Sequence, residues 1–135
     1  MTLEQKDILF KDLSCRIPYD VKCKIEMWVG CDVCTVYNIN SIGCIEIVEY
    51  CDINDVSIER VKPYLFPLSS MTEEQREEYE RIIYKSIELH WHRYYDVVDV
   101  DDIDCLIDFY HKNHIDYRGL IPMGLAEDAT NKNIY

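Results

Sequence analysis

The sequence predicts an α+β fold in which a small antiparallel sheet of three to four strands packs against a long helix and a C-terminal helix. Apolar residues alternate with polar ones between residues 21 and 51, which is typical of half-buried strands. They recur at helical spacing in residues 79–94 and again in residues 103–110. Turn residues separate the strand-like runs closely, which favours an antiparallel meander over crossovers through helices.

A short helix is predicted at the start of the chain. Thr2 and Gln5 have the spacing of a capping box, in which each side chain bonds the backbone N–H of the other residue. An apolar stripe follows in residues 8–13. Pro18 ends this helix, because proline restricts the preceding residue to extended conformations.

Three strands are predicted next, in residues 21–29, 33–39 and 44–51, and in the second strand the apolar alternation is expected at Val33, Thr35, Tyr37 and Ile39. Gly30 to Asp32 form the turn between the first two strands, and Asn40 and Ser41 mark the end of the second.

A polar break and two prolines separate these strands from the next helix. Residues 52–55 form the break, and residues 57–61 predict a short helical turn. Pro63 and Pro67 exclude a helix interior or a central strand, because proline has no N–H to donate. We therefore expect an extended segment here that crosses the sheet or lies at its edge.

The long helix is the clearest element of the sequence. Thr72 and Gln75 form a second capping box, and Glu73 and Glu74 suit the positive end of the helix dipole. The helical spacing continues for about 20 residues. Another helix follows, with Asp101 or Asp102 as its N-cap.

The length and charge of the chain limit its function. A chain of 135 residues predicts one domain, residues 1–135. The net charge is -12, divided into -4 for residues 1–71 and -8 for residues 72–135. Such a field repels nucleic-acid backbones and anionic lipid, so we expect no direct nucleic acid and no membrane among the partners. A basic protein is the favoured partner.

The cysteines and the N-terminus favour a cytoplasmic location. Seven cysteines are an odd number, and the first ten residues are too polar for a signal peptide, so we expect reduced thiols rather than a disulfide scaffold. No apolar run approaches the roughly 20 residues that span a bilayer.

Two pairs of residues are weak candidates for a metal site. Cys31 and Cys34 form a CxxC near a predicted turn, where thiolates can converge on zinc, but no second pair accompanies them. His111 and His114 are three residues apart and could share a helix face, with aspartates nearby. We expect His114 instead to end the helix, with its ring bonded to exposed carbonyls. The expected cofactor is none, and no catalytic residue is predicted, because nucleophile-elbow, P-loop and dinucleotide-binding signatures do not occur in the sequence.

The segment after the last helix mixes polar, glycine and apolar residues without periodicity. Its binding candidates are Asp116, Tyr117 and Arg118, together with His114. Tyr and Arg are enriched at interface hot spots. A structural role is the favoured interpretation: Arg118 ties the segment to the body through one of the acids of the strongly acidic half, residues 72–135, and Gly119 turns the chain at positive φ.

Three stretches of the sequence resemble a family of small uncharacterised proteins from anaerobic gut bacteria, their phages and mobile elements. They are KDLSCRIPYDVKCKI, VKPYLFPLSSMTEEQ and HIDYRGLIPMGLAEDATNKNIY. The chain departs from the family pattern at Phe109-Tyr110, where a tryptophan-leucine pair is usual, and at Pro122-Met123, where a charged residue often precedes the second glycine. The resemblance implies a genomic setting and a compact α+β domain, and it implies no chemistry.

Three hypotheses for function follow. The first is a non-enzymatic protein-protein interaction module with an acidic face rich in tyrosine, which accounts for 11 residues of the chain. The second is an acidic mimic that inhibits a nucleic-acid-binding protein. The third is a small metal-dependent hydrolase that uses His111, His114 and nearby aspartates. A non-enzymatic role is favoured.

Overall fold

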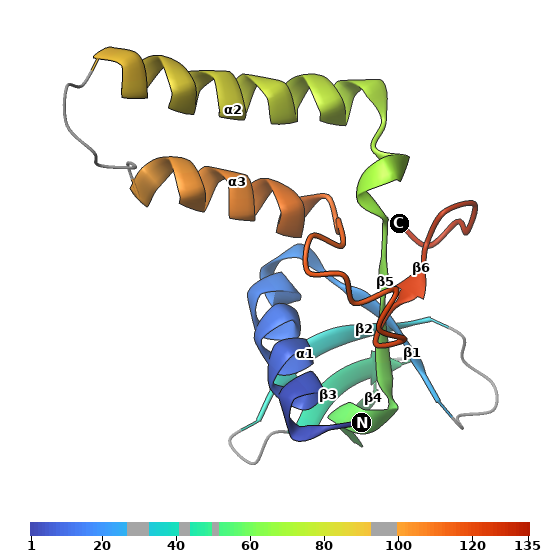
Figure 1. The fold of residues 1–135 in the computed structure, drawn as a ribbon. Coiled ribbons are helices and arrows are strands. Elements are labelled where there is room, and N and C mark those ends of the chain that lie inside the picture. The colour runs from blue at the N-terminus through green and yellow to red at the C-terminus, as the bar shows by residue number, and fades with distance from the viewer. Residues whose placement is uncertain (27–32, 41–43, 50–51, 93–99) are drawn as a thin grey trace.

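The computed structural model describes residues 1–26, 33–40, 44–49, 52–92 and 100–135, and it confirms the α+β class (Figure 1). Its helices are α1 (Leu3–Arg16), α2 (Glu73–His92) and α3 (Val100–Lys112), with short 3-10 turns η1 (Ile17–Tyr19), η2 (Ile58–Arg60) and η3 (Leu68–Ser70). Its strands are β1 (Lys22–Ile25), β2 (Cys34–Ile39), β3 (Cys44–Glu49), β4 (Asp52–Ser57), β5 (Val61–Leu65) and β6 (Glu127–Asp128).

The sheet has six strands, in the order β4-β3-β2-β1-β5-β6, so the prediction of three to four strands was too low. The meander from β1 to β3 is antiparallel as predicted, β4 continues it antiparallel to β3, and β5 also pairs antiparallel with β1. Only β6 pairs in parallel, with β5. The predicted polar break is the edge strand β4: an edge strand accepts polar residues that a central strand excludes. Its Val56 still turns into the core.

Strand β5 lies inside the sheet although it contains a proline. Pro63 faces Cys23 in the register with β1, and that pair is the last one of the two strands. The missing N–H of Pro63 therefore falls where the regular ladder ends, which explains how the segment can be a strand.

Both capping boxes are confirmed. Thr2 Oγ1 accepts a hydrogen bond from the Gln5 N–H at 3.1 Å, and Gln5 Oε1 accepts one from the Thr2 N–H at 2.9 Å. Thr72 and Gln75 form the same pair of bonds at the start of α2, at 2.9 and 3.2 Å. These bonds satisfy N–H groups that have no partner inside the helix.

The helix that covers the sheet is α1, whereas the sequence assigned this place to the long helix and the C-terminal helix. Leu9 and Leu13 of α1 are fully buried in the core cluster. Helices α2 and α3 pack on each other as a hairpin that stands away from the sheet (Figure 1). Among the described residues, no helix is long and apolar enough to cross a membrane.

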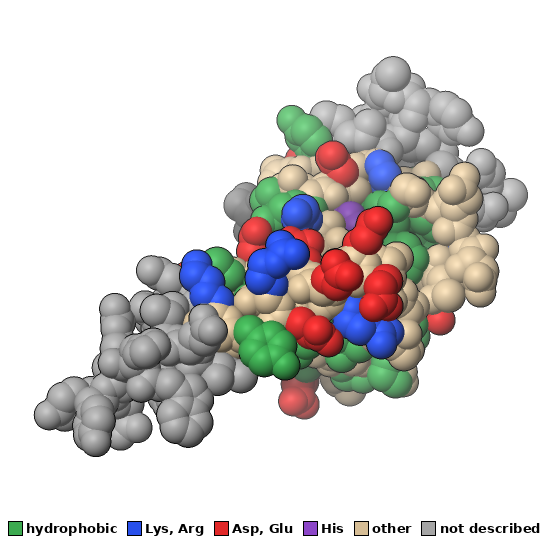
Figure 2. All heavy atoms as spheres, turned by 90° about the horizontal axis from the view of Figure 1, so that it is seen from above, with side chains coloured by type: hydrophobic (Ala, Val, Ile, Leu, Met, Phe, Trp, Pro, Cys, Tyr) green, Lys and Arg blue, Asp and Glu red, His purple; other side chains and the backbone are tan. Residues whose placement is uncertain are grey.

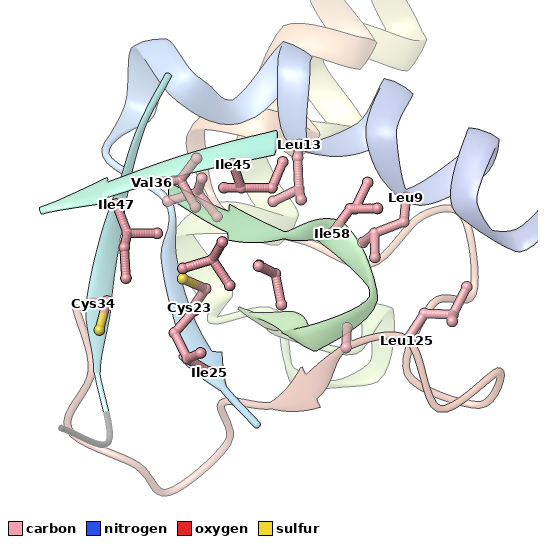
Figure 3. Close-up of a cluster of buried hydrophobic side chains, with 14 of the residues drawn as sticks. Leu9, Leu13, Cys23, Ile25, Cys34, Val36, Ile45, Ile47, Ile58 and Leu125 are labelled. Carbon is pink, nitrogen blue, oxygen red and sulfur yellow. The ribbon is translucent and has the colours of Figure 1, made fainter. Parts of the chain in front are cut away.

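The core is an apolar layer between α1, the sheet and the segment after α3 (Figure 3). Strands β1, β3 and β5 contribute alternate side chains to it. In β2 the buried residues are Cys34 and Val36, so the prediction that Thr35 and Tyr37 lie on the apolar face is wrong: Tyr37 is 58% exposed. The cluster contains Leu9, Leu13, Val21, Cys23, Ile25, Cys34, Val36, Ile45, Ile47, Val56, Ile58, Val61, Leu65, Leu120, Leu125 and Ala126.

Candidate functional site

Helix α3 ends in a Schellman motif that sets the direction of the segment with the candidate residues. The Ile115 N–H bonds the Tyr110 carbonyl at 2.8 Å, and the His114 N–H bonds the His111 carbonyl at 3.1 Å. His114 has φ +53°, at the position where glycine is usual. The prediction that His114 ends the helix is therefore confirmed. The predicted bond from its ring to a carbonyl is wrong, because the ring stacks on Tyr135 instead.

A fully buried ion pair on α1 holds this segment in place. Asp12 and Arg16 are one helical turn apart, and neither side chain is exposed to solvent. Arg16 Nε and Nη2 lie 2.7 and 3.1 Å from the two carboxylate oxygens of Asp12. The guanidinium also donates to the carbonyls of Tyr110, at 3.3 Å, and Ile115, at 2.8 Å. Arg16 thus joins α1 to the Tyr110 carbonyl in the last turn of α3 and to the Ile115 carbonyl just after that helix.

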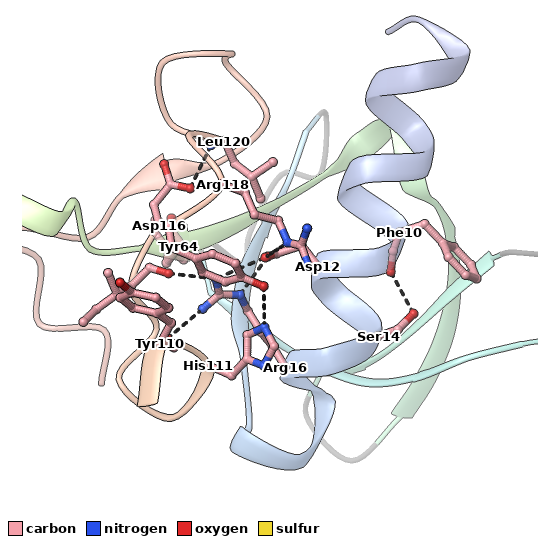
Figure 4. A network of polar contacts seen from close by, with 12 residues as sticks. Phe10, Asp12, Ser14, Arg16, Tyr64, Tyr110, His111, Asp116, Arg118 and Leu120 are labelled. Carbon is pink, nitrogen blue, oxygen red and sulfur yellow. Dashed lines mark hydrogen bonds and ion pairs between the residues drawn. The ribbon is translucent and has the colours of Figure 1, made fainter. Parts of the chain in front are cut away.

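Arg118 reaches the same cluster from the segment after α3 (Figure 4). Arg118 Nε lies 3.3 Å from Asp12 Oδ1, so Asp12 is shared by two arginines. The predicted carboxylate partner is thus found, but it comes from α1 and not from the acidic residues 72–135. The Arg118 guanidinium also lies 4.9 Å from the centre of the Tyr117 ring, which is the distance of a cation–π contact. The Tyr117 ring stacks in turn on Tyr110, with 4.9 Å between centroids and 11° between planes.

We call Asp12, Arg16, Tyr110, His111, Tyr117 and Arg118 the polar junction. His111 Nε2 lies 2.9 Å from the Tyr117 hydroxyl. Arg118 is the exposed member, with a side chain that is 34% exposed, whereas Tyr110 and Tyr117 are half-buried and the side chains of Asp12 and Arg16 are 0% exposed.

Asp116 organises the turn that follows. Its two carboxylate oxygens accept hydrogen bonds from the N–H groups of Leu120 and Ile121, each at 2.8 Å. Asp116 is buried, and Gly119 has φ +75°, which confirms the predicted turn. Both oxygens of the carboxylate are therefore engaged inside the protein.

Tyr135 joins the segment after α3 to strands β1 and β5. Its ring stacks on His114, with 3.8 Å between centroids and 13° between planes, and meets Phe66 at 5.9 Å. Its hydroxyl donates to the Tyr64 carbonyl at 2.8 Å and accepts from the Lys22 N–H at 3.1 Å. The Tyr135 side chain thus links the first residue of β1, the end of β5 and His114 in the segment after α3.

Burial determines the protonation of the aromatic groups. It lowers the pKa of His114 to about 4, with the charges of Arg16 and Lys22 acting in the same direction. Burial also lowers the pKa of His111, where Arg16 contributes again. Burial and the neighbouring Tyr79 raise the pKa of Tyr110 to about 12. Both imidazoles are therefore neutral at pH 7, so neither histidine contributes a positive charge to this region.

The structure separates the candidate metal ligands. The His111 ring contacts Tyr117 and the His114 ring contacts Tyr135, so the two histidines face different tyrosines. Cys34 is buried on β2, and Cys31 lies outside the described residues. Among the described residues, no group of three or more histidine, cysteine or carboxylate side chains is arranged to hold a metal ion.

Three residues of this region were missed by sequence reasoning: Asp12, Arg16 and Tyr135. The spacing of Asp12 and Arg16 is the one signal that could have found them, because residues four apart on a helix are neighbours. Their burial could not be anticipated, since charged side chains are almost never fully buried unless they are paired. No local pattern marks Tyr135 as an anchor.

Comparisons with protein-family models, with curated proteins and with solved structures found no match to this chain. The function is therefore argued from the geometry of the chain itself.

The polar junction has the chemistry of a structural clamp. Its buried carboxylate is shared by two guanidinium groups, and the Tyr117 hydroxyl is next to a neutral imidazole. Its cation with an exposed side is Arg118, which could contact a carboxylate of another molecule.

Proposed function

We propose that this protein is a non-enzymatic interaction module that binds a basic protein through the outward face of α2. The observation that carries the proposal is the position of the hairpin of α2 and α3, which stands away from the sheet and presents a charged outer surface (Figures 1 and 2).

One stripe along α2 has the composition of a contact surface. Glu73, Glu77, Glu80 and Tyr84 are all exposed, and their spacing of four, three and four residues places them on one face of the helix. Tyr84 is 65% exposed, although a tyrosine ring is large and mostly apolar. We call these four residues the α2 stripe. An exposed aromatic ring among carboxylates suits a partner with basic and apolar groups.

The carboxylates of the α2 stripe are available to a partner. Within the described part of the chain, Glu78 of α2 pairs with Lys112 at 3.7 Å, and no cation lies within ion-pair distance of Glu73, Glu77 or Glu80. The net charge of -12 adds a long-range attraction for a basic protein.

The surface favours one protein partner over mimicry of a nucleic acid. Arg76, Arg81 and Lys85 are also exposed on α2, and Figure 2 shows acidic and basic side chains next to each other on one face. A mimic of a phosphate backbone needs a more continuous negative surface than this mixed pattern.

The setting that we propose is the cytoplasm of a gut anaerobe, with the gene on the host chromosome, a phage or a mobile element. The thiols of Cys15, Cys44 and Cys105 lie outside any disulfide, which supports a reducing compartment.

The proposal is tested by affinity capture with three baits from a native lysate of the source organism. One is the wild-type chain. The second is the stripe variant Glu73→Gln, Glu77→Gln, Glu80→Gln and Tyr84→Ala. The third is a control, Glu4→Gln, Asp20→Asn and Glu46→Gln, which removes the same charge from other surfaces.

We expect the wild-type chain and the control to retain the same protein, and the stripe variant to lose it. Raising the salt concentration should release that protein, because exposed charges are screened. Retention of the same protein by the stripe variant, or no specific protein on the wild-type bait, would contradict the proposal.

A further inference from the structure

Helices α2 and α3 form a hairpin whose apolar side chains are only partly covered. The start of α2 lies against the end of α3: Gln75 Nε2 donates to Asn113 Oδ1 at 3.1 Å, and the Tyr79 ring lies 6.1 Å from Phe109 and 6.2 Å from Tyr110. Among the described side chains of these two helices, the buried apolar one is Phe109, which is 2% exposed. Helices in bundles cover the remaining apolar surface with further helices.

One side of the hairpin carries an apolar row that includes both helices. Because α2 and α3 are antiparallel and Tyr79 meets Tyr110, Ile83 (one turn after Tyr79) is level with Ile107 (one turn before Tyr110). Ile103 extends the row by another turn of α3. Ile103 is 47% exposed, and the other four side chains are half-buried. We call Tyr79, Ile83, Ile103, Ile107 and Tyr110 the hairpin seam.

The hairpin seam is closed at one end and open at the other. Tyr117 stacks on Tyr110 at 4.9 Å between centroids and covers the end that is next to the body. The first turns of α3, which carry Ile103, extend beyond α1 (Figure 1). From Ile103 to Tyr110 the row is about 10 Å long, or two helical turns. It therefore has the length of a contact with one short helix.

Exposed carboxylates lie on both sides of the hairpin seam. Glu80 is one turn before Ile83 on α2, and Asp104 is one turn before Ile107 on α3. At about 100° per residue, each carboxylate is farther around its helix from the α2–α3 contact than the isoleucine is. In the described part of the chain, no cation lies within ion-pair distance of Glu80 or Asp104. The seam is thus an apolar row between two free negative charges.

This charge pattern selects the occupant. A helix with an apolar face and Lys or Arg on both flanks matches an apolar row between carboxylates. A second copy of this chain would bring its own Glu80 and Asp104 to the same surface, where like charges repel. The same charges repel phosphate backbones and anionic lipid.

We propose that the hairpin seam is the docking site for an amphipathic helix of the partner protein, with an apolar face and Lys or Arg on both flanks. The inference rests on the proposed function, because Glu80 belongs to the α2 stripe and attracts the same basic protein. It adds the element of the partner that is bound, and it adds α3 to the contact surface. The docked helix packs on Ile83, Ile103 and Ile107 and pairs its cations with Glu80 and Asp104.

The test uses the wild-type chain and an acetylated, amidated peptide of leucine and lysine, about five helical turns long. Its leucines recur at spacings of three and four residues. The matched peptide has the same composition with leucine and lysine alternating, which is the pattern of a strand. Titration calorimetry should give saturable binding of the helical peptide, at least about tenfold tighter than the alternating one. Chemical-shift changes should map to Ile83, Ile103 and Ile107.

The apolar contact is tested by Ile103→Ser in the full chain. This position is 47% exposed, so the change leaves the packing of the hairpin intact. We expect the helical peptide to bind about fivefold more weakly, because the apolar area that the peptide covers is lost. Leu3→Ser, at a residue that is 84% exposed on α1, is the control and should bind like the wild-type chain. Circular dichroism verifies that both variants are folded.

The charges are tested by the double variant Glu80→Gln, Asp104→Asn. We expect about threefold weaker binding at low salt, and no difference from the wild-type chain at high salt, because exposed charges are screened. Glu4→Gln with Asp20→Asn removes the same charge from other surfaces and is the control. It should bind like the wild-type chain at low salt.

The absence of saturable binding, equal affinity for the two peptides, or equal binding by the wild-type chain and Ile103→Ser would overturn the helix-binding seam. So would equal binding by the wild-type chain and the double variant at low salt. These failures are separate from failure of the proposed function. A lysate protein that the wild-type bait retains and the stripe variant loses keeps the α2 stripe as a contact surface, whatever the peptides show.

Discussion

The apolar core under α1 and the polar junction beside it are built from the same helix in opposite ways. Leu9 and Leu13 turn toward the sheet, where burial of apolar surface stabilises the fold without directional bonds. Asp12 and Arg16 turn toward α3, where every contact depends on direction and charge. The apolar contacts of α1 hold the helix on the sheet, whereas the polar junction determines where α3 and the following segment attach to α1. Replacing a whole buried ion pair by apolar residues is often neutral or stabilising, whereas removing one partner is strongly destabilising.

The largest effect is expected from breaking the junction at its centre. Arg16→Met leaves the Asp12 carboxylate buried with only the Arg118 contact at 3.3 Å. Removing one partner of a buried pair costs about 3–5 kcal/mol, so we expect a loss of about that size in the free energy of unfolding, measured with urea.

The double variant Asp12→Leu, Arg16→Met is the matched control for this prediction. It removes both charges, and apolar replacement of a whole buried pair is often neutral. We therefore expect it to be more stable than Arg16→Met alone. A single variant at least as stable as the double variant would contradict the buried-charge explanation.

The core itself is tested by Leu13→Ala. Leu13 is 0% exposed, and truncating a buried leucine to alanine costs about 2–5 kcal/mol through lost burial and the cavity that remains. We expect about 3 kcal/mol by urea unfolding, without the charge effects of the junction. Leu3→Ala on the same helix is the control, since Leu3 is 84% exposed. Equal losses from both variants would show that α1 does not pack on the sheet as described.

Acid should weaken the attachment at His114. Its pKa is about 4 in the folded chain and about 6.5 in an unfolded chain. Between these values the unfolded chain binds a proton that the folded chain does not, so the free energy of unfolding falls as the pH falls from about 6.5 to about 4. From pH 7 to pH 5 this contribution is about 2 kcal/mol.

The measurement is urea unfolding of the wild-type chain and of His114→Asn at both pH values. Asparagine does not titrate and tolerates positive φ. The variant should lose less stability than the wild-type chain over this interval. The same pH dependence in both proteins would show that His114 is not the titrating group.

The smallest effect is expected at the exposed edge of the junction. Arg118→Ala removes an ion pair in which the arginine side chain is 34% exposed. Such pairs contribute about 0–1 kcal/mol, so we expect a loss below about 1 kcal/mol by the same unfolding assay. A loss as large as that of Arg16→Met would mean that Arg118, rather than Arg16, holds the junction together.

Local patterns of the sequence predicted most of the elements. The two capping boxes and the alternating residues of β1 and β3 are confirmed within the described residues, as are the end of α3 at His114 and the turn at Gly119, whereas the predicted apolar face of β2 is wrong. All of these depend on residues within about six positions of each other. Strands β4 and β5 were missed because an edge strand tolerates polar residues, and because a proline can lie at the last rung of a ladder.

The candidate residues could be placed on the chain by sequence, but their roles were decided by the tertiary structure. The sequence alone determined that His114, Asp116, Tyr117 and Arg118 lie in an irregular segment after a helix, and that Arg118 needs a carboxylate. Only the fold determined that this carboxylate is Asp12, and that Arg16 bonds carbonyls 94 and 99 residues away. Caps, turns and alternation depend on neighbouring residues, whereas burial of a charge and completion of a ladder depend on which distant segments meet.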